Sequence, residues 1–254
     1  MRLTVLGSSA SQPAAGDASS GYLITEGAST LLVDCGSGVL GRLLEHASID
    51  AVDAIVISHM HADHYIDLIA LRYGRRYGAP GQREIPVYLP PGGSARLQAV
   101  SEAISSTQPF FAGVLSLRDY TPGDRIEVGE LSVRPLEVVH GIPSFGMRIV
   151  GRGGATLAYS SDTVCCDEVV ELARDADLFV AENTLGGGAP SLHQPVTHLS
   201  AEEAGQLAAR AGAGRLVLTH FWHTADRELA RTEATRHFEG EVLAARPHLI
   251  VEVG

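Results

Sequence analysis

The chain has 254 residues, of which 45% are hydrophobic, 19% charged and 6% aromatic. This composition is too apolar for a disordered protein and suffices to bury a core, so we expect one domain that covers residues 1–254. The formal net charge of −11 argues against a surface that binds long nucleic acids, because such binding depends on Lys and Arg.

The cysteine content and the first residues indicate a compartment. Cys35, Cys165 and Cys166 are an odd number and lack zinc-finger spacing, which favours a reducing environment. The start MRLTVLGSSA lacks the longer apolar stretch of a signal peptide, and no window holds about 18 consecutive apolar residues. We therefore expect a cytoplasmic protein without a membrane partner.

In the first half of the chain, short β-branched or aliphatic runs alternate with Gly- and Ser-rich turns, a pattern typical of strands. Strands are predicted at 2–7, 21–25, 30–34, 53–57 and 85–90, and helices at 39–46, 66–77 and 94–105. Arg72, Arg75 and Arg76 form the one basic cluster, on the helix predicted at 66–77, and indicate either a solvated helix face or a contact with an anion.

The second half repeats this order of strands followed by helices. Strands are predicted at 124–128, 131–140, 145–150, 155–162, 176–182 and 215–220, and helices at 167–174 and 201–212, before a last helix and strand. Ser200 and Glu203 form a capping box before the helix at 201–212. Two strand blocks with following helices predict an α/β fold in which two mixed sheets lie between layers of helices, an αββα sandwich.

The run His59-Met60-His61-Ala62-Asp63-His64 places four metal-ligand side chains directly after an apolar strand. Zinc prefers imidazole nitrogen and carboxylate oxygen, and catalytic zinc sites leave one position open for water. His59 and His61 alternate along the chain, whereas Asp63 and His64 begin the next helix, so the two pairs can point in different directions. The run alone therefore predicts a metal site, with a chance cluster in an exposed turn as the alternative.

Three further residues of the same type end apolar strands, namely His140, Asp162 and His220. Each of them by itself is better explained as a hydrogen-bonded histidine or a turn aspartate than as a metal ligand. Their shared position at strand ends, together with the histidine run, favours a centre with two metal ions.

These residues resemble the metallo-β-lactamase-fold superfamily, whose signature His-x-His-x-Asp-His is met by residues 59–64. The resemblance implies that His59, His61 and His140 bind a first metal, that Asp63, His64 and His220 bind a second, and that Asp162 bridges them. It also implies two Zn²⁺ ions per chain, with Mn²⁺ or Fe²⁺ as alternatives, and often a homodimer.

Three segments, SSDT (160–163), HLSAEE (198–203) and LVLTH (216–220), resemble the ribonuclease Z and cyclic-nucleotide phosphodiesterase branch of the superfamily. That resemblance implies that His198 lies beside the scissile phosphate, that Glu182 orients His198, and that Asp63 contributes to catalysis as well as to metal binding. The alternatives are a helix-start residue for His198 and a surface carboxylate for Glu182. His193, Trp222 and His223 are further pocket candidates of unassigned role.

Together these patterns predict a dizinc phosphodiesterase that acts on a small anionic phosphodiester, such as a cyclic nucleotide or cyclic phosphate, through a metal-bridging hydroxide. The alternatives are 3′ trimming of transfer RNA precursors, as in ribonuclease Z, and another hydrolytic activity of the same fold. The segment 78–124 is short and poor in basic residues, which argues against a clamp arm for transfer RNA. A diiron oxidoreductase is disfavoured because His61 stands where such proteins usually have Glu, and a non-catalytic scaffold because every ligand position is filled.

Overall fold

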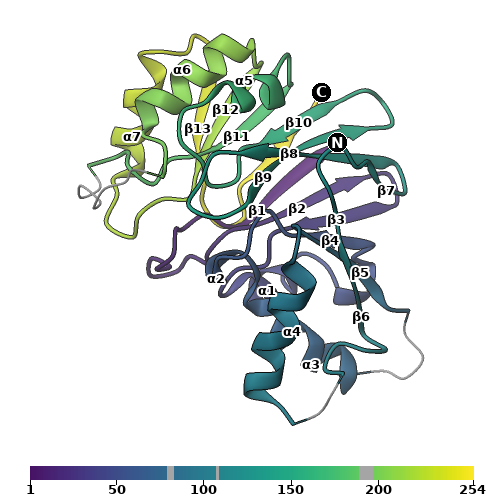
Figure 1. The fold of residues 1–254 in the computed structure, drawn as a ribbon. Helices are drawn as coiled ribbons and strands as arrows, with labels where there is room; N and C mark the ends of the chain where they lie inside the picture. The colour runs from purple at the N-terminus through teal and green to yellow at the C-terminus, as the bar shows by residue number, and fades with distance from the viewer. Residues whose placement is uncertain (79–82, 107–108, 189–196) are drawn as a thin grey trace.

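The computed structural model describes residues 1–78, 83–106, 109–188 and 197–254. Within these ranges the chain forms two seven-stranded β-sheets that pack face to face, with helices on both outer faces (Figure 1). This arrangement confirms the predicted αββα sandwich. None of the helices in the described part of the chain is both long and apolar enough to cross a membrane.

The first sheet combines antiparallel strands at one side with parallel strands at the other. Its order is β14 (Ile250–Glu252), β1 (Arg2–Gly7), β2 (Gly21–Glu26), β3 (Ser29–Val33), β4 (Ala54–Val56), β5 (Ile85–Leu89) and β6 (Leu115–Asp119). The helices of this half are α1 (Val39–Leu43), α2 (Ala62–Tyr65), α3 (Asp67–Arg76) and α4 (Gly93–Ile104), with a 3₁₀ turn at Ile49–Ala51. Leucines of α1, α3 and α4 share one apolar cluster with this sheet.

The second sheet has the same mixed character. Its order is β13 (Glu241–Ala244), β12 (Arg215–Thr219), β11 (Leu178–Glu182), β10 (Thr156–Tyr159), β9 (Ser144–Gly151), β8 (Leu131–Val138) and β7 (Ile126–Val128). Its helices are α5 (Asp167–Ala173), α6 (Ala201–Ala211) and α7 (Arg227–Thr235). The predicted capping box is present at the start of α6, where the Ser200 and Glu203 side chains each accept a hydrogen bond from the other residue's backbone N–H.

The strand sequences reflect what covers each strand. Every residue of β10 and β11 is buried, because helices cover one face of these parallel strands and the other sheet covers the opposite face. β8 instead alternates buried with more exposed residues, as expected for an antiparallel strand with one face toward the core. The buried parallel strands β10 to β12 carry candidate site residues at or just beyond their carboxyl ends.

Three local expectations differ from the structure. One strand was predicted after the last helix, whereas the structure has two, β13 and β14. Strand β6 was not predicted, because Leu115–Asp119 has only two apolar residues, which suffice for an edge strand that buries one face. Of the three arginines of the basic cluster, Arg76 is exposed, as a solvated helix face requires, whereas Arg72 and Arg75 are buried at 3% and 6% exposure. The Arg72 guanidinium donates to the Phe110 carbonyl and lies over its ring.

Candidate metal centre

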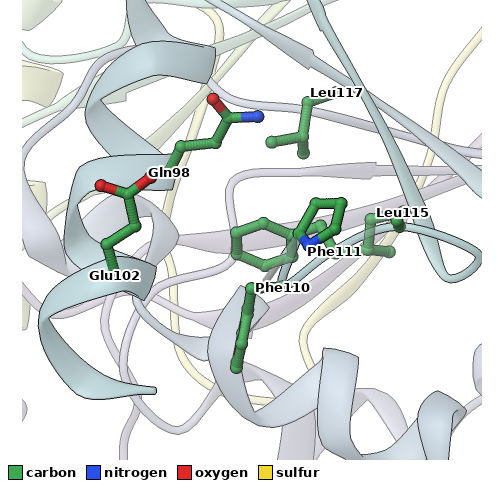
Figure 2. Close-up of a pocket in the computed structure, with 8 residues that line it drawn as sticks. Gln98, Glu102, Phe110, Phe111, Leu115 and Leu117 are labelled. Carbon is green, nitrogen blue, oxygen red and sulfur yellow. The ribbon is translucent and has the colours of Figure 1, made fainter. Parts of the chain in front are cut away.

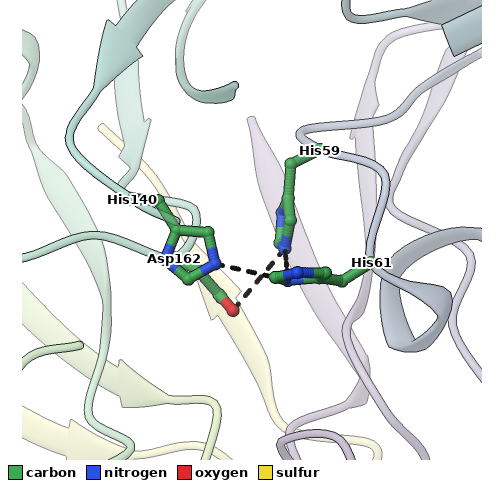
Figure 3. Close-up of side chains that lie close together, drawn as sticks. All are labelled: His59, His61, His140 and Asp162. Carbon is green, nitrogen blue, oxygen red and sulfur yellow. Dashed lines mark hydrogen bonds and ion pairs between the residues drawn. The ribbon is translucent and has the colours of Figure 1, made fainter. Parts of the chain in front are cut away.

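Strand ends from both sheets bring the candidate ligands together. His59 follows β4 in the first sheet, while His140, Asp162 and His220 follow β8, β10 and β12 in the second. His59 also forms an isolated antiparallel bridge with Ser144, which connects the two sheets next to the site. Figure 3 shows His59, His61, His140 and Asp162 converging from opposite sides of this junction.

The first cluster consists of three imidazoles that point their nitrogens at one another (Figure 3). His61 Nδ1 lies 3.1 Å from His59 Nε2 and 3.3 Å from His140 Nε2. Two nitrogens bound to one tetrahedral zinc at about 2.0–2.1 Å would lie about 3.3–3.4 Å apart. The three imidazoles therefore have the spacing of ligands around one ion.

The second cluster combines two imidazoles with one carboxylate. Asp63 Oδ2 lies 3.3 Å from His220 Nε2 and 3.6 Å from His64 Nε2. His64 and His220 are almost entirely buried. These three groups are also mutually close enough to surround a single ion.

Asp162 lies between the two clusters and presents one carboxylate oxygen to each. Its Oδ2 is 3.6 Å from His59 Nε2 in the first cluster. Its Oδ1 is 3.5 Å from His64 Nε2 and 3.4 Å from His220 Nε2 in the second. A carboxylate in this position has the geometry of a bridge between two metal ions.

Two buried polar atoms at the centre lack a hydrogen-bond partner among the described residues, His64 Nε2 and Asp162 Oδ1. An unsatisfied buried polar atom costs about 1–3 kcal/mol, so such atoms call for an explanation. Burial lowers the pKa of His59 well below its usual value, whereas the carboxylates of Asp162, Asp63 and Asp34 outweigh burial and raise the pKa of His64 well above it. The donor set of imidazoles and carboxylates therefore fits divalent metal ions.

The ring nitrogens that face away from the clusters have their own partners. His64 Nδ1 donates to Asp34 Oδ2 at 2.8 Å, and His140 Nδ1 donates to the Thr197 carbonyl at 2.9 Å. His220 Nδ1 lies 2.7 Å from Thr184 Oγ1. Such outer hydrogen bonds fix the tautomer and orientation of metal-binding histidines.

Asp34 was not among the site residues predicted from the sequence, although its position at the end of a strand could have indicated it. Like Asp162, it ends an apolar strand, here the predicted strand 30–34. It is completely buried, and its carboxylate accepts hydrogen bonds from the Ser58 N–H and hydroxyl and from the Tyr159 hydroxyl as well as from His64. Its role is to hold the second cluster in place from outside.

We expect Asp34→Asn to weaken metal binding at the second cluster about 10- to 100-fold, the usual effect of removing such an outer partner. The amide nitrogen of Asn has no lone pair for the donors that surround this carboxylate. Competition with a chromophoric chelator measures the affinity, and Asp124→Asn, at an exposed loop position, is the matched control. Equal affinities of Asp34→Asn and wild type would contradict the assignment.

Three residues at the centre have a backbone conformation that is unusual for residues other than glycine. Asp34, Ser161 and His220 have φ values of 59°, 56° and 56°, in the left-handed region that side-chain-bearing residues rarely adopt. His220 is a candidate ligand, Asp34 contacts the candidate ligand His64 from outside the cluster, and Ser161 directly precedes Asp162. Non-glycine residues in this region often mark functional sites.

His198 and Glu182 form a buried acid–imidazole pair beside the clusters. His198 Nδ1 donates to Glu182 Oε1 at 2.9 Å and lies 3.9 Å from Asp162 Oδ2. Burial opposes the charged imidazole, but the Glu182 charge and hydrogen bond outweigh it and raise the pKa of His198 to about 9. Glu182 also accepts from the Thr163 and Thr184 N–H groups. It is fully buried, which contradicts its alternative interpretation as a surface carboxylate.

The clusters open into a cavity of about 340 Å³. It is lined by Ala10, Ser11, His61, Ala62, Asp63, Asp162, Thr184, His198, His220 and Trp222. A larger cavity of about 550 Å³ lies between α4 and β6, where Phe110, Phe111, Leu115 and Leu117 line it (Figure 2). Its charged side chain is Glu102, and it contains no candidate metal ligand, so the smaller cavity is the candidate reaction site.

Comparison with known proteins places the chain in a family. Residues 29–221 match the family model described as the Beta-lactamase superfamily domain. The chain belongs to this superfamily. It is 38% identical to the uncharacterised protein Rv1339 of Mycobacterium tuberculosis. The 247 aligned residues cover 96% of this chain and 89% of that protein.

Two further members of the superfamily carry functional names. The probable metallo-hydrolase YhfI of Bacillus subtilis is 32% identical over 255 residues, which is 99% of this chain and 100% of that protein. A ribonuclease Z of Myxococcus xanthus is 30% identical over 306 residues, covering 100% of this chain and 98% of that protein. These relatives confirm a metallo-hydrolase related to ribonuclease Z.

Solved structures agree with this assignment. The crystal structure of YhfI superposes with a TM-score of 0.87 at 29% identity and covers 99% of both chains. A diphosphatase of the PhnP family superposes with a TM-score of 0.75 at 21% identity, covering 99% of this chain and 97% of that one, and this likeness concerns the fold alone. The chain is thus a superfamily metallo-hydrolase whose His/Asp clusters are able to hold metal ions.

The structure brings together all of the site residues predicted from the sequence. The seven proposed ligands form the two clusters and the carboxylate between them, and His198 and Glu182 lie beside them. Their roles in metal binding and catalysis remain predictions. His193 lies outside the described residues. Trp222 lines the cavity, whereas His223 is half-buried with its ring next to the indole.

Proposed function

We propose that the protein is a phosphodiesterase that uses two metal ions, Zn²⁺ being the preferred pair, to hydrolyse a small phosphodiester such as a cyclic nucleotide or cyclic phosphate. The observation that carries this proposal is the His198–Glu182 pair: the His198 imidazole lines the same cavity as several of the candidate ligands, and the buried Glu182 carboxylate accepts a hydrogen bond from it. A charged imidazole beside a metal centre suits a substrate that is anionic and has an alkoxide leaving group, which a phosphodiester is.

Each group has a separate role in the proposed reaction. The His/Asp clusters would hold two divalent ions, which would supply an activated water and offset the charge of the phosphodiester. His198 would donate its proton to the departing oxygen, and Glu182, which accepts the Nδ1–H, would hold the ring in the required tautomer. Asp63 and Asp162 contribute to catalysis by fixing the ions that the histidines bind.

The size of the cavity and the charge of the chain favour a small substrate. A volume of about 340 Å³ is at the lower end of small-molecule sites, which run to about 300–1,000 Å³. The alternative, 3′ processing of transfer RNA precursors, is supported by the ribonuclease Z relative. Against it, the segment 78–124 has three arginines and four acidic residues, and the chain carries a net charge of −11.

A substrate screen tests this proposal. Metal-quantified protein is assayed with bis(p-nitrophenyl) phosphate, with 3′,5′- and 2′,3′-cyclic nucleotides, and with a transfer RNA precursor. We expect hydrolysis of the small phosphodiesters and its loss after chelation, with recovery on adding Zn²⁺. Specific 3′ cleavage of the precursor would favour the alternative, and fully metal-loaded protein that hydrolyses none of them would refute both.

We expect Glu182→Gln to move the alkaline limb of the kcat–pH profile to lower pH. Activity that requires protonated His198 is present below the pKa of this group and is lost as pH rises through it. The Glu182 carboxylate raises that pKa, so the neutral amide lowers it and the loss begins earlier.

The matched control is Glu168→Gln, an exposed position on α5, which leaves the profile in place. A Glu182→Gln profile with lower activity but an unchanged limb would show that Glu182 only supports the fold.

A further inference from the structure

The chain's single tryptophan, Trp222, lies in the wall of the reaction cavity. Its backbone position is fixed by the preceding residue. The Phe221 N–H donates to the Ser8 carbonyl at 2.8 Å, and the Ala10 N–H donates to the Phe221 carbonyl at 2.8 Å. The Phe221 ring is buried at 1% exposure. Trp222 therefore follows a residue that is held by packing and by backbone hydrogen bonds, and it lies two positions after the candidate ligand His220.

The indole itself has no fold-supporting polar contact in the described part of the chain. Its ring is only partly buried and contacts the His223 ring at 5.2 Å between centroids. No hydrogen bond of its N–H is present among the described residues. Buried Trp side chains usually pair this N–H, so an unpaired indole at a cavity wall has a face and a donor available to a ligand.

The chemistry of the neighbouring groups limits what that ligand can be. A flat π-face binds either a cationic group or another aromatic ring. Two divalent ions in the same cavity of about 340 Å³ would repel a cation, which leaves a neutral aromatic ring. The cavity is large enough for one phosphate-bearing group of nucleotide size but not for a folded polynucleotide.

We propose that Trp222 is the base-binding residue of the site, which stacks on the nucleobase of a nucleoside phosphodiester while the metal ligands and His198 engage the phosphate. This inference rests on the proposed function and narrows its substrate class from cyclic phosphates in general to those that carry a base. Trp222 sets specificity and takes no part in the chemical step.

The kinetic test compares two substrates that differ only in the base, adenosine 3′,5′-cyclic phosphate and methyl riboside 3′,5′-cyclic phosphate. We expect Trp222→Ala to lower the ratio of their kcat/KM values about 10- to 100-fold, the range expected for loss of one stacked base, mainly through KM for the nucleotide. Trp222→Phe should restore most of the ratio. Tyr77→Ala, which truncates an aromatic residue that is 78% exposed and does not line this cavity, should leave it unchanged.

A binding measurement separates this inference from the proposed function. Because Trp222 is the sole tryptophan, intrinsic fluorescence of the metal-loaded wild type reports directly on contact with it. We expect saturable quenching by adenosine monophosphate and little change with ribose 5-phosphate. Equal responses to both, or an unchanged kcat/KM ratio in Trp222→Ala, would overturn the inference. If metal-loaded protein hydrolyses neither cyclic phosphate nor any other phosphodiester of the substrate screen, the proposed function fails and the fluorescence titration alone decides on base binding.

Discussion

Asp162→Ala is expected to abolish hydrolysis, with a loss of at least about a thousandfold, and to release metal. Asp162 is the one carboxylate among the described residues with an oxygen facing each cluster, so its removal takes a ligand from both proposed ions. Metal ions supply several kcal/mol of transition-state stabilisation, and each 1.4 kcal/mol corresponds to about tenfold in rate. Elemental analysis of the purified variant, together with its rate on bis(p-nitrophenyl) phosphate, measures both effects.

Two comparisons make this result specific. Asp162→Asn keeps the volume of the side chain and separates loss of the bridge from loss of packing, with circular dichroism to confirm that both variants fold. Asp167→Asn, whose carboxylate is 89% exposed in a surface ion pair with Arg210, should keep full metal content and activity. An Asp162→Ala protein that retains two ions per chain would refute the bridging assignment.

His198→Ala is expected to lower kcat by about 10²–10⁴-fold while leaving the metal content unchanged. His198 Nδ1 lies 2.9 Å from Glu182 Oε1, and His198 belongs to neither of the two ligand clusters. Its loss therefore removes a proton donor but none of the proposed metal ligands. The loss should be larger for a cyclic nucleotide than for bis(p-nitrophenyl) phosphate, because p-nitrophenolate leaves without needing a proton. Single-turnover rates on both substrates measure this difference.

The control for this variant is His237→Ala, at a half-buried histidine on the outer surface near Glu202. It removes an imidazole that is 33% exposed, against 17% for His198, and should change neither rate nor metal content. His198 would instead be a metal ligand if His198→Ala released an ion, since Asp162, His198 and His220 are also mutually close. Equal losses on the two substrates would argue against proton donation.

The sequence pattern predicted the fold and the ligand clusters for a physical reason. Parallel strands buried on both faces read as continuous apolar runs, and their carboxyl ends meet at one edge of a sheet. A ligand-type residue at the end of such a run, as at Asp162 and His220, is therefore visible without coordinates. The His59–His64 run follows a strand of the first sheet. In one short segment it supplies the ligands that complement those of the second sheet.

Other features depend on contacts that no local pattern records. Asp34 ends a strand in the same way as Asp162, yet only the structure shows that it contacts His64 from outside the centre. The burial of Arg72 results from its contact with Phe110, 38 residues later in the chain. The edge strand β6 exists because β5 lies beside it, and its own residues are a weak signal.

The left-handed residues Asp34, Ser161 and His220 have a consequence for the stability of the metal-free protein. Each such conformation costs about 1–3 kcal/mol, and bound metal offsets this cost in the native state only. Copies that fail to acquire their ions should therefore unfold and be degraded sooner than loaded ones. In a cell short of metal, the abundance of this protein would fall along with its activity, and the molecules that remain folded would be those that hold metal.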